Sequence, residues 1–284
     1  MADATDNATE RATEDAGKPG RLRRFHERFM VEERFVAASA RRNLIIIAVV
    51  LMVVGLAAFL FILDSVFEAD DVSVIDRPVE DWLETARTDW LTSVMAVIAF
   101  VFGPVVMPII ILVTVVTWGI LAKHAWRPML LAGGMILGVA IVQALAPLID
   151  RDRPPISDML LEVDRTASFP SGHVMGVADF LFITTYLVFS RHRNPLMALL
   201  AYVVATAIVL LTAACRIYLG YHWATDALAS ISLSLVVLGL VILVDTWRTV
   251  RVRPPGMSEE EADGDTFGDA GDASTARGDT SAGS

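Results

Sequence analysis

Six long apolar segments follow one another between residues 43 and 244 of this chain. In chain order they are 43–63, 91–122, 129–149, 174–190, 196–214 and 223–244. A helix needs about 20 apolar residues to cross a hydrocarbon layer of about 30 Å. No strand-like alternation of polar and apolar positions competes with this interpretation. The pattern predicts an all-α protein that crosses a membrane several times.

The segment 91–122 is ambiguous, because its length as one helix would be about 48 Å. Gly103 and Pro104 in its middle permit either a kink or a turn between two helices. Basic residues precede the first apolar segment and follow the second, fourth and sixth, whereas residues 64–90 carry nine acids and two bases. Since basic loops stay in the cytoplasm, the segment must cross an odd number of times. We predict one crossing, kinked near Pro104, and six spans in total.

This topology predicts a multi-pass cell-membrane protein with both termini in the cytoplasm. The loops expected on the extracytoplasmic side are 64–90, 150–173 and 215–222. The expected domains are a cytoplasmic tail with a basic juxtamembrane segment at 1–42, a six-helix membrane domain at 43–246 and an acidic, disordered cytoplasmic tail at 247–284.

Composition agrees with this division. Hydrophobic residues make up 55% of the 284 residues, yet the net charge is −10. Residues 1–20 carry net −3 and 257–284 carry net −7, which leaves 21–256 neutral. Such ends are typical of disordered tails. No basic run stands apart from the apolar segments, so we expect no nucleic-acid partner. Cys215 is the single cysteine, which excludes an intrachain disulfide.

Arginines and histidines from separate segments gather at the extracytoplasmic ends of the predicted spans. They are Arg151, Arg153, Arg165, His173, Arg216 and His222. Guanidinium groups neutralise and orient phosphate oxygens, and imidazoles attack phosphorus or transfer protons. The combination indicates a substrate that contains phosphate.

Two of these segments suit catalysis. Ser171, Gly172 and His173 lead into a span, and the backbone N–H groups at a helix start can bind an anion. His222 and Asp226 are four residues apart at another helix start, so both lie on one face. A carboxylate there can hold one ring nitrogen as N–H and leave the other nucleophilic. Taken singly, these segments are equally compatible with a helix cap and a structural histidine–aspartate pair.

Together, the segments resemble the phosphatase signature of the type 2 phosphatidic acid phosphatase (PAP2) superfamily, K-x6-R-P, P-S-G-H and S-R-x5-H-x3-D. The matching positions are Arg153-Pro154, Pro170-Ser171-Gly172-His173, and Arg216, His222 and Asp226. The resemblance covers roughly residues 90–245. It implies a six-helix PAP2-type bundle and a lipid phosphatase that uses no metal and no cofactor.

The resemblance also implies a role for each matching residue. His222 would attack phosphorus and form a phosphohistidine, and Asp226 would orient it. His173 would protonate the leaving oxygen and then activate water. The groups that would bind the phosphate oxygens are Arg153, Arg216, the Ser171 hydroxyl and the Gly172 backbone N–H. Such groups stabilise the charge of the transition state without a metal.

Two positions depart from the signature. Ala146 stands where the signature has lysine, and Cys215 where it has serine. Arg151 or Arg165 can replace the missing positive charge, and Arg151 is the nearer in sequence. We therefore include Arg151 among the expected phosphate-binding residues.

Three functions are compatible with these residues, and we favour the first. It is the hydrolysis of a lipid-linked phosphate or diphosphate of the phosphatidic acid, phosphatidylglycerophosphate or polyprenyl diphosphate class. The others are phosphoryl transfer to a lipid or sugar hydroxyl, and lipid binding without catalysis, which the alanine at position 146 favours. The expected partners are the lipid substrate and the bilayer, and the sequence identifies no protein partner.

Some remaining residues carry further expectations. Asp179, inside the fourth apolar segment, is expected to have a structural partner, and Gln143 is expected to bond to a neighbouring helix. Five aromatic residues near the outer boundaries are expected to anchor the protein at the interface: Trp82, Trp90, Tyr218, Tyr221 and Trp223. For Tyr218 and Tyr221 the alternative is a position at the border of the substrate. Residues 64–90 form either a short amphipathic helix over the site or a simple linker.

Overall fold

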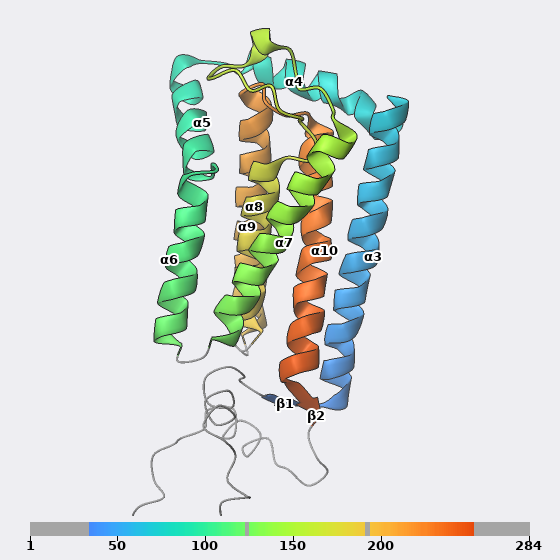
Figure 1. Ribbon diagram of the computed structural model, residues 1–284, viewed down its shortest axis with the longest axis vertical. Coiled ribbons are helices and arrows are strands. Elements are labelled where there is room, and N and C mark those ends of the chain that lie inside the picture. The colour runs from blue at the N-terminus through green and yellow to red at the C-terminus, as the bar shows by residue number, and fades with distance from the viewer. Residues whose placement is uncertain (1–33, 123–124, 191–193, 253–284) are drawn as a thin grey trace, which may run out of the picture.

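The protein is a bundle of long helices that run along one axis (Figure 1). The computed structural model describes residues 34–122, 125–190 and 194–252. The long elements are α3 (Ala38–Glu68), α5 (Asp89–Val101), α6 (Val106–Leu121), α7 (Trp126–Ile149), α8 (Gly172–Phe189), α9 (Pro195–Tyr218) and α10 (Ala224–Thr249). The short elements are β1 (Arg34–Val36), η1 (Asp71–Ile75), α4 (Asp76–Thr85), η2 (Ile156–Asp158) and β2 (Val250–Val252).

The helices account for at least five of the six predicted membrane spans. Within the described residues, five helices are long and apolar enough to cross a membrane, and α5 with α6 forms a pair bent by 47° that has the length and composition of either a sixth, broken span or a re-entrant loop. The bend follows from the sequence Gly103-Pro104, because proline has no N–H to continue the helical hydrogen bonds. The expected break near Pro104 is confirmed, and the single crossing of 91–122 stays a prediction.

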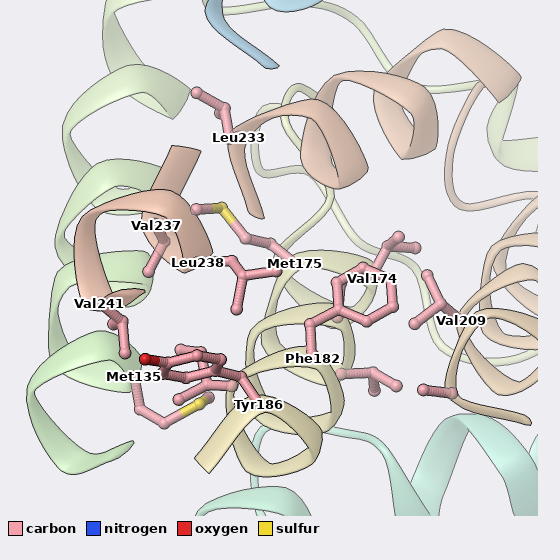
Figure 2. Packing of buried hydrophobic residues seen from close by; sticks show 14 of the residues in the cluster. Met135, Val174, Met175, Phe182, Tyr186, Val209, Leu233, Val237, Leu238 and Val241 are labelled. Carbon is pink, nitrogen blue, oxygen red and sulfur yellow. The ribbon is translucent and has the colours of Figure 1, made fainter. Parts of the chain in front are cut away.

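Helices α8 and α10 form the centre of the bundle. Half of the spanning window of α8 and 61% of that of α10 are buried, against 22–28% for α3, α7 and α9. Figure 2 shows this packing, with Val174, Met175, Phe182 and Tyr186 of α8, Leu233, Val237, Leu238 and Val241 of α10, Met135 of α7 and Val209 of α9. The outer helices expose apolar side chains such as Val53, Leu112 and Val203, as expected where lipid is the solvent. The two central helices are also those that begin at the predicted catalytic segments.

The three expected extracytoplasmic loops lie at one end of the bundle (Figure 1). The first of them contains α4, which crosses over that end and packs against α9 and α10. Of the two alternatives for residues 64–90, the helix is therefore the correct one.

The sequence predicted no strand, and the pair β1–β2 corrects this expectation. Residues 34–36 pair in parallel with 250–252, and each strand is too short to show an alternating pattern. The pair lies at the end of the bundle opposite α4 (Figure 1). Helix α3 begins before residue 43 and α10 continues past residue 246. Most of both expected tails, 1–33 and 253–284, lies outside the described residues.

Candidate active site

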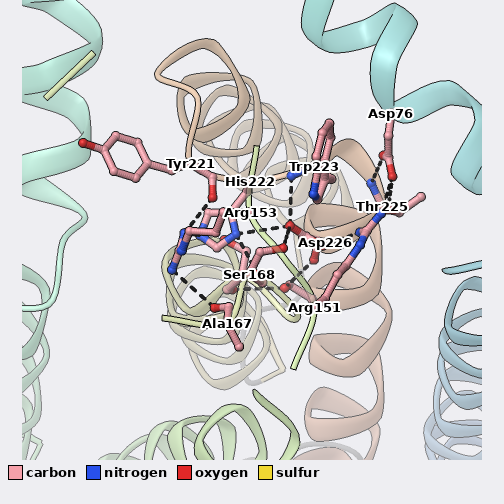
Figure 3. Close-up of polar contacts among 12 residues, drawn as sticks. Asp76, Arg151, Arg153, Ala167, Ser168, Tyr221, His222, Trp223, Thr225 and Asp226 are labelled. Carbon is pink, nitrogen blue, oxygen red and sulfur yellow. Dashed lines mark hydrogen bonds and ion pairs between the residues drawn. The ribbon is translucent and has the colours of Figure 1, made fainter. Parts of the chain in front are cut away.

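His222 is buried in the short turn between α9 and α10, at the end of the bundle that carries the three loops. Its Nδ1 lies 2.8 Å from the carbonyl oxygen of Ser168 and 3.4 Å from Oδ2 of Asp226 (Figure 3). A carbonyl oxygen only accepts hydrogen bonds, so Nδ1 carries the proton. Nε2 lies 3.3 Å from Nη1 of Arg153, which only donates. Both contacts indicate a lone pair on Nε2, the nitrogen that can attack phosphorus.

The electrostatics of the turn keep this imidazole neutral. The pKa of His222 falls to about 4, chiefly because burial disfavours the imidazolium ion. The hydrogen bond to Asp226 opposes this shift, and the positive charge of Arg216 adds to it. At neutral pH, His222 is therefore in the nucleophilic form.

Asp226 lies in the first turn of α10 and is fully buried. Its Oδ2 accepts hydrogen bonds from the Ser168 hydroxyl at 2.7 Å and from the backbone N–H of Trp223 at 2.9 Å. Its Oδ1 forms an ion pair with Nη1 of Arg151 at 2.5 Å. These contacts hold the carboxylate in one orientation beside His222.

Arg151 extends this network towards the loop helix α4 (Figure 3). Its Nη2 lies 2.6 Å from Oδ2 of Asp76, the first residue of α4. Asp76 is buried and also accepts from the backbone N–H and the hydroxyl of Thr225, at 2.9 and 2.7 Å. Both terminal nitrogens of Arg151 thus bind carboxylates. These contacts do not support the phosphate-binding role that the sequence suggested for Arg151.

Sequence reasoning missed Asp76 and Ser168. Asp76 is one of nine acids in the segment 64–90, and nothing in its sequence surroundings distinguishes it. Ser168 stands two residues before the P-S-G-H segment, so its proximity to the site was a usable signal, but its contacts with His222 and Asp226 depend on how the loop folds.

Arg153 lies directly beside His222. Its Nη1 donates to the carbonyl oxygen of Tyr221 at 2.6 Å, and its Nε donates to that of Thr166 at 2.9 Å. Its Nη2 forms an ion pair with Asp164 at 2.9 Å. The loop between α7 and α8 thereby fixes the guanidinium group next to Nε2 of His222.

Arg216 and Ser171 are buried and incompletely bonded. The Arg216 guanidinium lies 4.4 Å from the centre of the Tyr221 ring, and its Nε has no hydrogen-bond partner in the described part of the chain. The Ser171 hydroxyl, at the N-cap of α8, also lacks one there. Buried donors without partners are costly, and a phosphate oxygen is a suitable acceptor for both.

His173 lies in the first turn of α8 and is half-buried. Its Nε2 faces the break between α5 and α6, 3.5 Å from the position that a Cβ on Gly103 would occupy. Arg216, His222 and Arg153 all act on it electrostatically. Two histidines and two arginines therefore share one site, with the Ser171 hydroxyl at its edge. Arg153 comes from the loop between α7 and α8, His173 from the start of α8, Arg216 from the end of α9 and His222 from the turn before α10.

Comparison with known proteins finds similar sequences and a similar fold. Residues 127–249 match the family model described as the PAP2 superfamily. Phosphatidylglycerophosphatase B of Bacillus subtilis (strain 168) is 27% identical over 197 residues, which are 66% of this chain and 92% of that protein. Residues 127–249, which include Arg153, His173, Arg216, His222 and Asp226, therefore match the family that the sequence motifs resemble.

A solved structure supports the same assignment. The crystal structure of the first transmembrane PAP2-type phosphatidylglycerolphosphate phosphatase from Bacillus subtilis superposes with a TM-score of 0.61 at 25% identity. The match covers 68% of this chain and 96% of that structure. This chain accordingly shares its membrane-helix fold with a phosphatase of the PAP2 type.

Two cavities meet at the α5–α6 break of this PAP2 bundle. An open one of about 910 Å³ is lined by Arg165, Arg216 and Tyr221, among others. A mainly apolar one of about 320 Å³ extends from His173 between α6, α7 and α8. Pro104 borders both. Arg165 was the second candidate to replace the lysine that the PAP2 signature has at position 146. It thus shares a cavity with Arg216.

A glycine sets the direction of the turn that carries His222. Gly220 has φ +77°, and a Cβ there would lie 2.2 Å from the carbonyl oxygen of Asp158. Both the backbone conformation and the close contact favour glycine over any other residue. The turn places Tyr221 and His222 beside the loop between α7 and α8.

The expectation for the aromatic residues holds only in part. Trp82 and Trp90 are each 68% exposed, as expected of interfacial anchors. Tyr218, Tyr221 and Trp223 are buried instead. Their polar atoms bond within the loops: Trp223 donates to the carbonyl of Asp152, Tyr221 to that of Glu162, and the Tyr218 hydroxyl contacts Thr88 and Thr92.

One group of acids in the described residues is close enough together to hold a metal ion. It consists of Glu80 and Glu84 of α4 and Asp158 of η2. Arg77 pairs with Glu80 at 3.1 Å, and Arg87 pairs with Glu84 at 2.9 Å. None of these residues belongs to the group around His222.

Proposed function

We propose that this protein hydrolyses the terminal phosphate of a membrane lipid of the phosphatidylglycerophosphate class, through a phosphohistidine on His222. The observation that carries the proposal is the state of this imidazole. Nδ1 is held as N–H by the Ser168 carbonyl and Asp226, and Nε2 has a lone pair beside Arg153. The names of both relatives, each a phosphatase for phosphatidylglycerophosphate, support the substrate class.

In the first step, Nε2 of His222 attacks phosphorus while the bond from phosphorus to the lipid oxygen breaks. His173, protonated in the substrate complex, gives its proton to that oxygen, so that the lipid leaves as a neutral alcohol. Arg153, Arg216, the Ser171 hydroxyl and the Gly172 N–H bind the phosphoryl oxygens. Asp226 stabilises the positive charge that develops on the imidazole ring.

In the second step, a water molecule attacks the phosphohistidine. His173, now neutral, takes a proton from the water as its oxygen bonds to phosphorus. The bond from phosphorus to Nε2 breaks, which releases inorganic phosphate and restores neutral His222. The proposed steps use the charge of two arginines where other phosphatases use a metal.

We further propose that the site faces the extracytoplasmic side and that both termini are cytoplasmic. The opposite end of the bundle carries the basic residues Arg41, Arg42, Arg127, Arg248 and Arg251. The positive-inside rule assigns that end to the cytoplasm. An impermeant thiol reagent applied to intact cells should label Thr85→Cys in α4 but not Val252→Cys in β2. The reverse pattern would refute this orientation.

The proposed reaction is tested by phosphate release in detergent with a chelator present. The substrate panel is phosphatidylglycerophosphate, phosphatidic acid and a polyprenyl diphosphate. We expect the highest kcat/KM for phosphatidylglycerophosphate and a loss of at least about a thousandfold in His222→Ala. Thermal melting of the variant checks that it is folded. Activity that survives in the folded variant, or that needs added metal, would contradict the mechanism.

A further inference from the structure

Asp179 is a buried carboxyl group that the proposed mechanism does not use. It lies in α8, six residues and thus about 9 Å further along the helix than His173, and both residues line the apolar cavity of about 320 Å³. Asp179 is 1% exposed, and by hydrogen-bond geometry neither of its oxygens has a partner among the described residues. The Ser234 hydroxyl of α10 lies near it but donates to the carbonyl of Met175, at 3.4 Å. Ser234 is therefore the one polar neighbour that acts on Asp179 among the described residues, and it leaves both carboxyl oxygens without a hydrogen bond of normal geometry.

The neighbouring helix leaves space for this carboxyl group. A Cβ on Gly138 of α7 would lie 2.0 Å from Oδ2 of Asp179, so any other residue would displace it. The walls around it are mainly apolar, with Met107 of α6, Met135 and Val142 of α7 and Met175 of α8. Gln143, which was expected to bond to a neighbouring helix, lines the same cavity.

The chemistry of the group follows from its surroundings. No cationic side chain in the described residues acts on Asp179, and an ionised carboxylate without a cation is costly at this depth in a membrane. The neutral acid carries an O–H donor. The cavity therefore has a catalytic imidazole at one end and a hydrogen-bond donor without an acceptor further along it.

A bound lipid can supply the acceptor. In a diacylglycerol phosphate, ester carbonyls lie a few bonds beyond the phosphate, where the acyl chains begin. Ether-linked and prenyl lipids have only hydrocarbon or ether oxygens at that depth. We propose that Asp179 is a specificity-determining residue that donates a hydrogen bond to an acyl ester carbonyl of the substrate. This inference rests on the proposed function, and it narrows the substrate class to ester-linked glycerolipids.

The test compares two phosphatidic acids of equal chain length, one with ester-linked and one with ether-linked chains. We expect the wild type to hydrolyse the ester lipid with a kcat/KM about tenfold higher, because the ether lipid leaves the buried donor unpaired. Asp179→Leu should lower this ratio to about one. Asp179→Asn keeps a donor and should retain a preference for the ester. Ser234→Ala, a matched change on α10, should retain the wild-type ratio.

The outcomes separate the two proposals. No hydrolysis of either lipid, or of phosphatidylglycerophosphate, by the wild type would overturn the proposed function. Hydrolysis with the same ester-to-ether ratio in the wild type and in Asp179→Leu would overturn the role of Asp179 alone. Loss of the preference in Ser234→Ala would also overturn it, because the effect would then come from the packing of α8 on α10. If Asp179→Leu does not fold, Gly138→Ala is the second variant. Its new methyl group displaces the Asp179 carboxyl group and should lower the ester-to-ether ratio of kcat/KM.

Discussion

Nη1 of Arg151 lies 2.5 Å from Oδ1 of Asp226, the oxygen of that carboxylate that does not face His222. The same guanidinium group binds Asp76 of α4 at 2.6 Å. Two ion pairs therefore connect the loop between α3 and α5 to the carboxylate that orients the nucleophile. In the proposed mechanism, Arg151 would therefore affect the reaction through Asp226 rather than through a contact with the substrate.

Replacement of Arg151 by methionine should lower kcat by about tenfold or more and leave KM within about twofold. Asp226 would lose the counter-ion of a buried pair and would no longer be held in place beside His222. Steady-state kinetics with phosphatidylglycerophosphate measure both constants. A rise in KM larger than the fall in kcat would instead support a direct contact between Arg151 and the phosphate.

The control for this prediction is a double-mutant cycle with Asp76→Asn. Asp76 reaches the site through Arg151 and Thr225, so the loss in the double variant should be clearly smaller than the product of the two single losses. Independent, multiplicative losses would show that Asp76 and Arg151 act separately.

Arg165 should contribute to substrate binding. It lines the open cavity together with Arg216 and is itself exposed, so its guanidinium can meet the head group as the lipid enters. We expect Arg165→Ala to raise KM by about two- to fivefold, since exposed charge pairs contribute up to about 1 kcal/mol. Arg165→Lys keeps the charge and is the matched control. Unchanged kinetics in Arg165→Ala would leave the missing motif lysine without a replacement.

His222 should remain neutral well below its usual titration range. Because the pKa of His222 in the folded protein is lowered to about 4, its ring is neutral at pH 7 and gains a proton only as the pH falls towards 4. Nitrogen-15 NMR of histidine-labelled enzyme, with His222→Ala to assign the signal, follows both ring nitrogens. Titration near the ordinary value of 6.5 would mean that the turn does not bury the ring as described.

Gly220→Ala should disrupt the turn before His222. The new Cβ would have to fit 2.2 Å from the carbonyl oxygen of Asp158 at a φ of +77°, and each of these features alone is unfavourable by about 1 kcal/mol or more. We expect a lower Tm and a loss of activity. Gly133→Ala is the matched control, because its Cβ would meet nothing within 4 Å. Equal Tm values for the two variants would contradict this account of the turn.

The spans and the main site residues could be predicted because each has a local signal. An apolar run as long as a bilayer is thick indicates a span, whatever the rest of the chain does. His222 and Asp226 are one helical turn apart, so their spacing alone places them on one face. The kink in 91–122 likewise has a local cause, the proline in its middle.

The features that the sequence did not reveal depend on contacts between distant segments. Arg151 pairs with Asp76, which lies 75 residues away in a different loop, and no periodicity in the sequence encodes that pairing. Tyr221 has the position of an interfacial anchor, but the Arg216 guanidinium and the loop between α7 and α8 hold it inside. Asp179 was expected to have a partner because a buried carboxyl group needs one, and only the cavity beside it shows that a ligand can take that place.

The His173→Ala variant tests most directly whether the reaction forms a phosphohistidine on His222. With p-nitrophenyl phosphate, the leaving group needs no proton, so the first step should proceed while the second lacks its base. We predict a rapid burst of about one nitrophenol per enzyme and an acid-labile phosphate on His222, found by mass spectrometry. The double variant His173→Ala/His222→Ala should show neither. A burst without label on His222, or label that persists in the double variant, would contradict the mechanism.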